Sequence, residues 1–187
     1  LIALGESIVA IGVGSGTAVD AGVVVSAVLG IVLAAAFWWL YFDVSSIGAE
    51  RRLRETPAGK EQNELARDAY SYLHFPMVAG IILVALGLKK TLAHHEESLD
   101  LVTATALVGG AVTYLAGLLA FRWRNIHVIS RPRSVCAVGI LVLIPLHDAI
   151  TSLAMLGALS AAFAALVAFE ALRYAESRSR IRASAHG

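Results

Sequence analysis

Apolar residues occur along this chain in long runs that short polar segments separate. A transmembrane helix needs about 20 mainly apolar residues. The clearest run covers residues 21–42, which hold no charge between Asp20 and Asp43 and end in an aromatic group suited to a membrane interface. Similar runs cover residues 72–88, 101–121 and 151–172. This pattern predicts membrane-spanning helices.

Two further segments are apolar but less regular. Residues 1–13 begin at the chain start, and residues 134–150 contain Pro145, His147 and Asp148. Counting both, the sequence predicts an all-α polytopic helical membrane protein with about six transmembrane helices in a single membrane domain. The last two spans would form a tight hairpin near His147. Because Leu1 lies within an apolar run, we expect the chain to be a fragment of a longer protein.

The distribution of basic residues indicates which side each connection faces. Lys and Arg concentrate in cytoplasmic loops of membrane proteins, and all but two of the 15 basic residues fall in alternate connections of the six-span arrangement. The opposite connections hold only Lys89 and Lys90. The asymmetry predicts a multi-pass protein of the bacterial cytoplasmic (inner) membrane with its C-terminus in the cytoplasm. If residues 134–150 did not cross, the four arginines after residue 172 would lie outside.

The polar connection at residues 43–71 has alternating charges and a break at Pro57-Ala58-Gly59. Glu50 and Arg54 stand four residues apart, a spacing that suits an exposed helical ion pair. We expect a cytoplasmic helical hairpin here, and a mobile loop is the alternative.

Composition supports the membrane assignment and argues against nucleic-acid binding and against a metal or cofactor site. The chain is 58% hydrophobic and 16% charged, with a mean hydropathy of +0.73. A net charge of +1 gives no basic field for nucleic acid, so the expected partners are the lipid bilayer and, as a possibility, further copies of the chain. The single cysteine and the lack of metal-ligand spacings predict no cofactor and no metal site.

Small residues recur every four positions in the first long run, at Gly22, Ser26, Gly30 and Ala34. Such a stripe lets membrane helices approach closely, so these residues are predicted to pack against another helix. A comparable series lies at Thr105, Gly109, Thr113 and Gly117. Static packing and a moving seam of a transporter are both compatible with the pattern.

Three motifs occur in a fixed order: LGESIVAI at residues 4–11, FWWLYFD at 37–43 and YSYLHFPMVAG at 70–80. Together they resemble the low temperature requirement A family of bacterial membrane proteins, up to about residue 92. The resemblance implies that this chain is the C-terminal half of a longer protein and that the N-terminal half is a partner. It also implies a role in growth at low temperature, but no agreed molecular activity and no catalytic residues.

Ionisable groups inside a membrane are costly and are functional candidates by default. Glu6 would lie near the middle of the first span, and Asp43 and His74 at the cytoplasmic ends of the second and third. Pro76 frees a backbone carbonyl close to His74. The tyrosines expected at the same level are Tyr41, Tyr70 and Tyr72. These groups predict a proton or substrate path, with Glu6, Asp43, His74, Tyr41 and Tyr72 as its residues.

Each of these groups also has a structural interpretation. Glu6 can be a protonated acid bonded to a neighbouring helix, and a hydrogen bond from His74 to Asp43 can simply fix two helices. Glu170 lies close to Arg173 and is expected to reach the cytoplasmic interface. The run His94-His95-Glu96-Glu97 is expected to be a solvated loop, because adjacent residues point in different directions.

Two classes of function therefore follow from the sequence. The first is a proton-linked transporter or channel-like protein, and the second is a structural or sensory membrane protein linked to growth in the cold. No nucleophile elbow, HExxH helix or Walker loop is present in the sequence. We therefore expect that the chain is not an enzyme.

Overall fold

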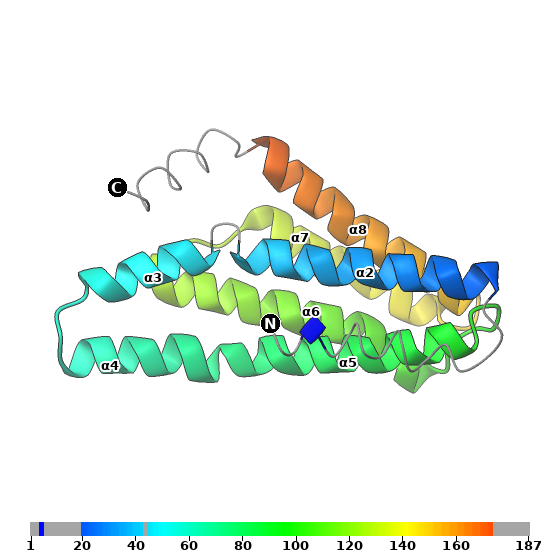
Figure 1. The fold of residues 1–187 in the computed structure, drawn as a ribbon, viewed down its shortest axis with the longest axis horizontal. Coiled ribbons are helices and arrows are strands. Elements are labelled where there is room, and N and C mark those ends of the chain that lie inside the picture. The colour runs from blue at the N-terminus through cyan, green and yellow to red at the C-terminus, as the bar shows by residue number, and fades with distance from the viewer. Residues whose placement is uncertain (1–3, 6–19, 43–44, 174–187) are drawn as a thin grey trace.

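The computed structural model describes residues 4–5, 20–42 and 45–173, and every regular element in these ranges is helical. The all-α prediction is confirmed. The elements are α2 (Ala21–Phe42), α3 (Ser45–Glu55), α4 (Lys60–Arg67), the π-helix η1 (Asp68–Tyr72), α5 (His74–Ala93), α6 (Leu101–Ile126), α7 (Arg131–Gly139), the 3₁₀-helix η2 (Ile140–Leu146) and α8 (Ser152–Arg173). They form an elongated bundle (Figure 1).

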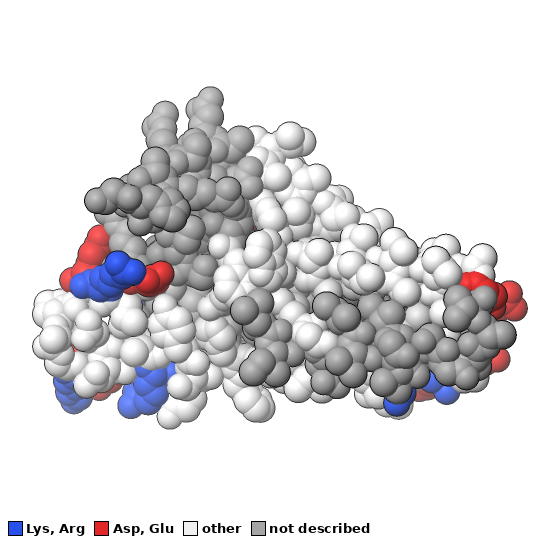
Figure 2. All heavy atoms as spheres, viewed as in Figure 1, with Lys and Arg blue, Asp and Glu red and all other residues white. Residues whose placement is uncertain are grey.

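Four helices of the described part are long and apolar enough to cross a membrane: Ala21–Phe42, Lys60–Ala93, Leu101–Ile126 and Ser152–Arg173. On the face seen in Figure 2, the charged side chains of the described residues gather at the two ends, and uncharged residues cover the middle. This distribution is typical of a helical membrane protein, whose central band contacts lipid.

The centre of the bundle is a close antiparallel pair formed by α5 and α6. The backbones meet at Gly80 and Gly110, where a Cβ built on Gly80 would lie 2.5 Å from the Gly110 carbonyl oxygen. A second close approach brings Gly87 against Leu107, and a third brings Gly117 against Met77. Helices in lipid associate by van der Waals contact, so small residues at the crossing stabilise this pair.

The series predicted at Thr105, Gly109, Thr113 and Gly117 matches this contact only at Gly117. Thr105 is exposed, and a Cβ built on Gly109 would meet only Thr105 of its own helix. The glycines of α6 that contact α5 are instead Gly110 and Gly117, which stand seven apart. Seven-residue spacing keeps two positions on one side of a helix that packs at a shallow crossing angle.

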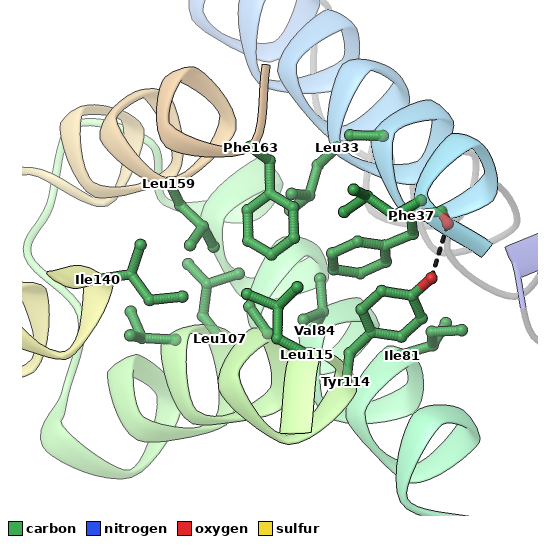
Figure 3. Close-up of a cluster of buried hydrophobic side chains, with 14 of the residues drawn as sticks. Leu33, Phe37, Ile81, Val84, Leu107, Tyr114, Leu115, Ile140, Leu159 and Phe163 are labelled. Carbon is green, nitrogen blue, oxygen red and sulfur yellow. Dashed lines mark hydrogen bonds between the residues drawn. The ribbon is translucent and has the colours of Figure 1, made fainter. Parts of the chain in front are cut away.

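Helices α2 and α8 complete the core through aromatic side chains (Figure 3). Phe37 stacks on Tyr114 with ring centroids 4.3 Å apart, and Phe163 meets Phe37 edge to face at 5.0 Å. The Tyr114 hydroxyl donates a hydrogen bond of 2.6 Å to the Phe37 carbonyl oxygen. This bond satisfies a buried polar group, as burial in an apolar core requires.

Residues 134–150, predicted as a less regular span, begin as an α-helix and continue directly as a 3₁₀-helix. The α-helix α7 begins at Arg131 and ends at Gly139, and η2 continues as a 3₁₀-helix that contains Pro145. Proline cannot donate the bond that an α-helix needs at this position. The segment nevertheless leads from the C-terminal end of α6 back to its N-terminal end, where His147 Nδ1 lies 3.0 Å from the Leu99 carbonyl oxygen.

The connection between α5 and α6 also fixes the start of α8. The Ser152 hydroxyl donates a hydrogen bond of 2.7 Å to the His94 carbonyl oxygen, and the Ser152 backbone amide donates one to the Glu97 carbonyl oxygen. At the start of α6, Asp100 accepts hydrogen bonds from the Thr103 hydroxyl and amide, which hold the pKa of the Asp100 carboxyl below its usual value. The C-terminal end of α5 and the N-terminal ends of α6 and α8 therefore lie at the same end of the bundle.

At the other end of the bundle, α3 and α4 lie on either side of a turn that contains Pro57 and Gly59, and they extend beyond the apolar helices (Figure 1). Glu50 and Arg54 form an exposed ion pair on α3. The chain then passes from α4 through η1 into α5. Arg124 of α6 pairs with Asp68 of η1 at 3.2 Å, which links this end of the two helices.

Candidate functional site

His74 lies at the first position of α5, where α2, η1 and α6 meet. Its Nε2 atom is 2.9 Å from the Tyr41 hydroxyl, and its Nδ1 atom is 2.8 Å from the Ala69 carbonyl oxygen. Because a carbonyl can only accept, Nδ1 carries a hydrogen and donates to Ala69. In the neutral imidazole, Nε2 then accepts the hydrogen of the Tyr41 hydroxyl. Both ring nitrogens are therefore hydrogen-bonded to protein groups.

The π-helix η1 makes the Ala69 carbonyl available to this histidine. In an α-helix the Leu73 amide would donate to Ala69, but here it donates to Asp68, five residues back, at 3.0 Å. Pro76 has no amide hydrogen, so the first turn of α5 lacks one backbone donor. Single π-turns often occur at functional positions of helices.

Three aromatic rings surround the imidazole. Phe121 of α6 meets it edge to face at 5.4 Å, and Tyr41 meets it at 5.4 Å in a similar orientation. Tyr70 stacks on it at 5.8 Å with an interplanar angle of 20°. We call Tyr41, Ala69, Tyr70, His74 and Phe121 the His74 cluster. The cluster connects α2, η1, α5 and α6 at one end of the apolar core.

The predicted path residues are only partly brought together. Tyr41 contacts His74, but Tyr72 is 64% exposed, and the guanidinium of Arg67 lies over its ring at 5.7 Å. Tyr70 stacks on the histidine instead. The spacing of Tyr70 and His74 by four residues would place them on one helix face, and this was the available sequence signal. Glu6 and Asp43 lie outside the described residues.

The predicted small stripe of α2 lies mostly inside the bundle. Ser26, Gly30 and Ala34 are buried, and Gly22 is half-buried. A Cβ built on Gly22 would collide with the His95 side chain. Close by on α2, the Leu29 carbonyl oxygen accepts a bond of 3.2 Å from the Ser160 hydroxyl of α8. The packing role of the stripe stays a prediction that these positions support.

A second polar cluster joins α7 to α8. Arg133 and Glu170 form a two-pronged ion pair, with Nε–Oε1 and Nη2–Oε2 distances of 2.8 and 2.7 Å. Their side chains are only 4% and 8% exposed. The expectation that Glu170 reaches the membrane interface was wrong, because the carboxylate turns inward to a buried guanidinium. In the sequence, Arg133 is one of the basic residues of a predicted cytoplasmic connection.

The polar run His94-His95-Glu96-Glu97 after α5, expected to be a solvated loop, holds metal-ligand residue types. His94 Nδ1 lies 3.5 Å from a Glu97 carboxylate oxygen, and His95 Nε2 lies 3.6 Å from Asp20. Within the described ranges, no group of three or more His, Cys, Asp or Glu side chains could hold a metal ion. The carbonyl groups of this loop bind the start of α8, as described above.

Comparison with known proteins extends the resemblance seen in the motifs. The family model described as "Bacterial low temperature requirement A protein (LtrA)" matches residues 1–169. An uncharacterized protein of Rhizobium meliloti (strain 1021) is 29% identical over 120 residues, which cover 64% of this chain and 29% of that relative. The matched region is thus less than a third of the relative's length. No solved structure matches this chain.

Proposed function

The chain belongs to the bacterial low temperature requirement A family, and from this premise we propose that it is a structural or sensory membrane protein whose His74 cluster holds α2, α5 and α6 together. The observation that carries this proposal is the full hydrogen bonding of the imidazole to Tyr41 and Ala69. A histidine satisfied in this way fixes helices, and the family description names a low temperature requirement.

The interior around the cluster favours a structural role. The apolar core that the His74 cluster adjoins includes Phe37, Leu40 and Leu118, all fully buried. A polar hydroxyl in this region, that of Tyr114, is already bonded to a backbone carbonyl. A proton path along this part of the core would need further polar groups or water.

Loss of the Tyr41–His74 bond tests the structural role. Tyr41→Phe leaves the Nε2 atom of a half-buried imidazole without its donor, which typically costs about 1–2 kcal/mol of unfolding free energy. We expect a lower thermal unfolding temperature in detergent and a matching loss of folded protein in cells. Tyr72→Phe, which removes an exposed hydroxyl, is the control and should unfold like the wild type. Equal stability of Tyr41→Phe and Tyr72→Phe would count against the structural role.

We further propose a six-span arrangement in the bacterial inner membrane, with the hairpin of residues 43–71 and the C-terminus in the cytoplasm. The bond between His147 and Leu99 supports a crossing by α7 and η2, because it places their end at the opposite level from their start. With rises of about 1.5 Å and 2.0 Å per residue, the two elements together extend about 28 Å. This length is close to the hydrocarbon thickness of a bilayer.

Thiol labelling in intact cells tests this topology. In a Cys136→Ser background, Ser98→Cys lies in the exposed loop between α5 and α6 and should react with an impermeant reagent from outside. Glu61→Cys lies on an exposed position of α4 and should react only after the cells are opened. Labelling of Glu61→Cys in sealed cells would overturn the arrangement, because thirteen basic residues share its side.

Proton-linked transport is a second candidate function, with Glu6, Asp43, His74, Tyr41 and Tyr72 along the path. The observation that favours it is access: His74 is half-buried, and Tyr70, which stacks on it, is 40% exposed. The hydroxyl of Tyr41 can both donate and accept, so the pair can pass a proton. A pH-driven flux in vesicles that contain the longer protein, abolished by Glu6→Gln with folding intact, would favour transport over the structural role.

Catalysis does not enter the proposal. We propose a non-enzymatic protein without cofactor or metal, whose partners are the lipid bilayer, the N-terminal half of the same protein and further copies of the chain. No nucleic-acid partner is proposed. The apolar outer surfaces of α2 and α5, with exposed residues such as Ile31, Ile82 and Leu86, support contact with lipid or with other apolar helices.

A further inference from the structure

An elongated apolar groove of about 550 Å³ lies between α7, η2 and α8. Its wall on α7 and η2 runs from Arg131 to Leu143, and small side chains on α8, at Ala158 and Ala162, leave the space open. Of the described residues that line the groove, Arg131 is the one that carries a charge. The groove is therefore apolar along its length and basic at one end.

A second arginine lies near the same end. Phe169 lines the groove, and the guanidinium of Arg173 lies over its ring at 5.9 Å. Helices α7 and α8 together hold three arginines and one acid, Glu170, and that carboxylate is already bound to Arg133. Among the described residues no ion pair neutralises Arg131 or Arg173, both of which are exposed, so they place positive charge at the mouth.

The dimensions fit one acyl chain. From Arg131 to Leu143 the wall is about 20 Å long, from rises of about 1.5 Å per residue in α7 and 2.0 Å in η2. One leaflet of a bilayer has a hydrocarbon depth of about 15 Å. A lipid with its phosphate at the mouth would therefore place its acyl chain along the groove down to the bilayer centre.

We propose that this groove binds an anionic phospholipid, with one acyl chain between α7 and α8 and the phosphate held by Arg131 and Arg173. The positive mouth is complementary to an anionic headgroup, and the apolar wall is complementary to the chain. That the bound lipid belongs to the cytoplasmic leaflet rests on the topology proposed above. The binding itself requires only that these helices lie in a membrane.

Lipid retention measures the binding directly. The protein is reconstituted in phosphatidylcholine vesicles with a minority of phosphatidylglycerol, extracted in mild detergent and analysed by native mass spectrometry. We expect one retained phosphatidylglycerol per chain, enriched over its share of the vesicle. Arg131→Gln with Arg173→Gln should weaken retention by about fivefold for each arginine removed. Lys89→Gln with Lys90→Gln, which removes the same charge at the opposite end of the bundle, should retain the lipid as the wild type does.

A groove-filling variant separates acyl-chain binding from headgroup attraction alone. Gly139 lines the groove, and a Cβ built on it would meet nothing within 4 Å, so Gly139→Leu starts its side chain in open space and adds apolar bulk to the groove. Its unfolding temperature should match the wild type, while its phosphatidylglycerol retention should fall although both arginines remain. Unchanged retention in Gly139→Leu would overturn the proposal, since the groove would then hold no chain.

Cys136 serves as a reporter of what occupies the groove, because it is the single cysteine and lines the wall. Added phosphatidylglycerol should slow its reaction with an apolar maleimide, and phosphatidylcholine should do so much less. Protection of Cys136 in lipid-free micelles that disappears on dilution would identify a second copy as the occupant. Equal protection by both lipids would show a groove without headgroup selection. Either result would contradict the proposal.

Discussion

Glu170→Ala is expected to lose about 3–5 kcal/mol of unfolding free energy, the typical result of removing one partner from a buried ion pair. The Arg133 guanidinium would remain in its site, 4% exposed, without the carboxylate that both of its prongs contact. This buried positive charge would then lie among apolar helices without its carboxylate partner. The change is measured as a shift in thermal or denaturant-induced unfolding in detergent micelles.

Two comparisons make this result specific. Glu50→Ala breaks the exposed pair with Arg54, whose side chains are 58% and 77% exposed, and should cost less than about 1 kcal/mol. The double change Arg133→Met with Glu170→Met replaces both charges by apolar groups and should recover most of the loss. If Glu170→Ala were as stable as Glu50→Ala, the Arg133–Glu170 pair would not contribute to the fold.

The apolar helices were predictable because their signal is local. A long uncharged run such as residues 21–42 predicts a segment in lipid. In lipid such a segment forms a helix, because a helix satisfies its backbone polar groups within itself. The end of α7 was not predictable in the same way. The change to a 3₁₀-helix at Ile140 depends on Pro145 and on the bond from His147 to Leu99, a contact between residues far apart in sequence.

For the candidate site, the sequence predicts which residues lie at the same depth in the membrane, but not which of them form hydrogen bonds with each other. The sequence places Tyr41 and His74 at the same level, but the choice of Tyr41 as the partner depends on how α2 and α5 are rotated. The π-turn that frees the Ala69 carbonyl from the backbone hydrogen bond of an α-helix has no simple sequence signature. Likewise, Arg133 counts as one of many basic residues in the sequence, and only the approach of α7 to α8 makes it the partner of Glu170.

The glycines of α6 give the sharpest test of the helix packing, because Gly109 and Gly110 are neighbours in different surroundings. A Cβ on Gly110 would lie 2.7 Å from the Gly80 carbonyl oxygen and 2.9 Å from the Val84 amide nitrogen. Backbone atoms cannot turn aside as side chains can, so α5 and α6 would have to separate. We expect Gly110→Ala to lose about 1–3 kcal/mol or more of unfolding free energy, as overpacked cores do.

Gly109→Ala is the matched control and should change stability in the opposite direction. A Cβ on Gly109 would meet only the Thr105 side chain at 3.7 Å, an ordinary van der Waals contact. Without a steric cost, replacing a helical glycine by alanine gains up to about 1 kcal/mol from helix propensity. Unfolding of the two variants in the same detergent should therefore move to opposite sides of the wild type. If both variants were equally stable, α5 and α6 would not meet through Gly110, and the sequence series through Gly109 would again be a candidate for the contact face.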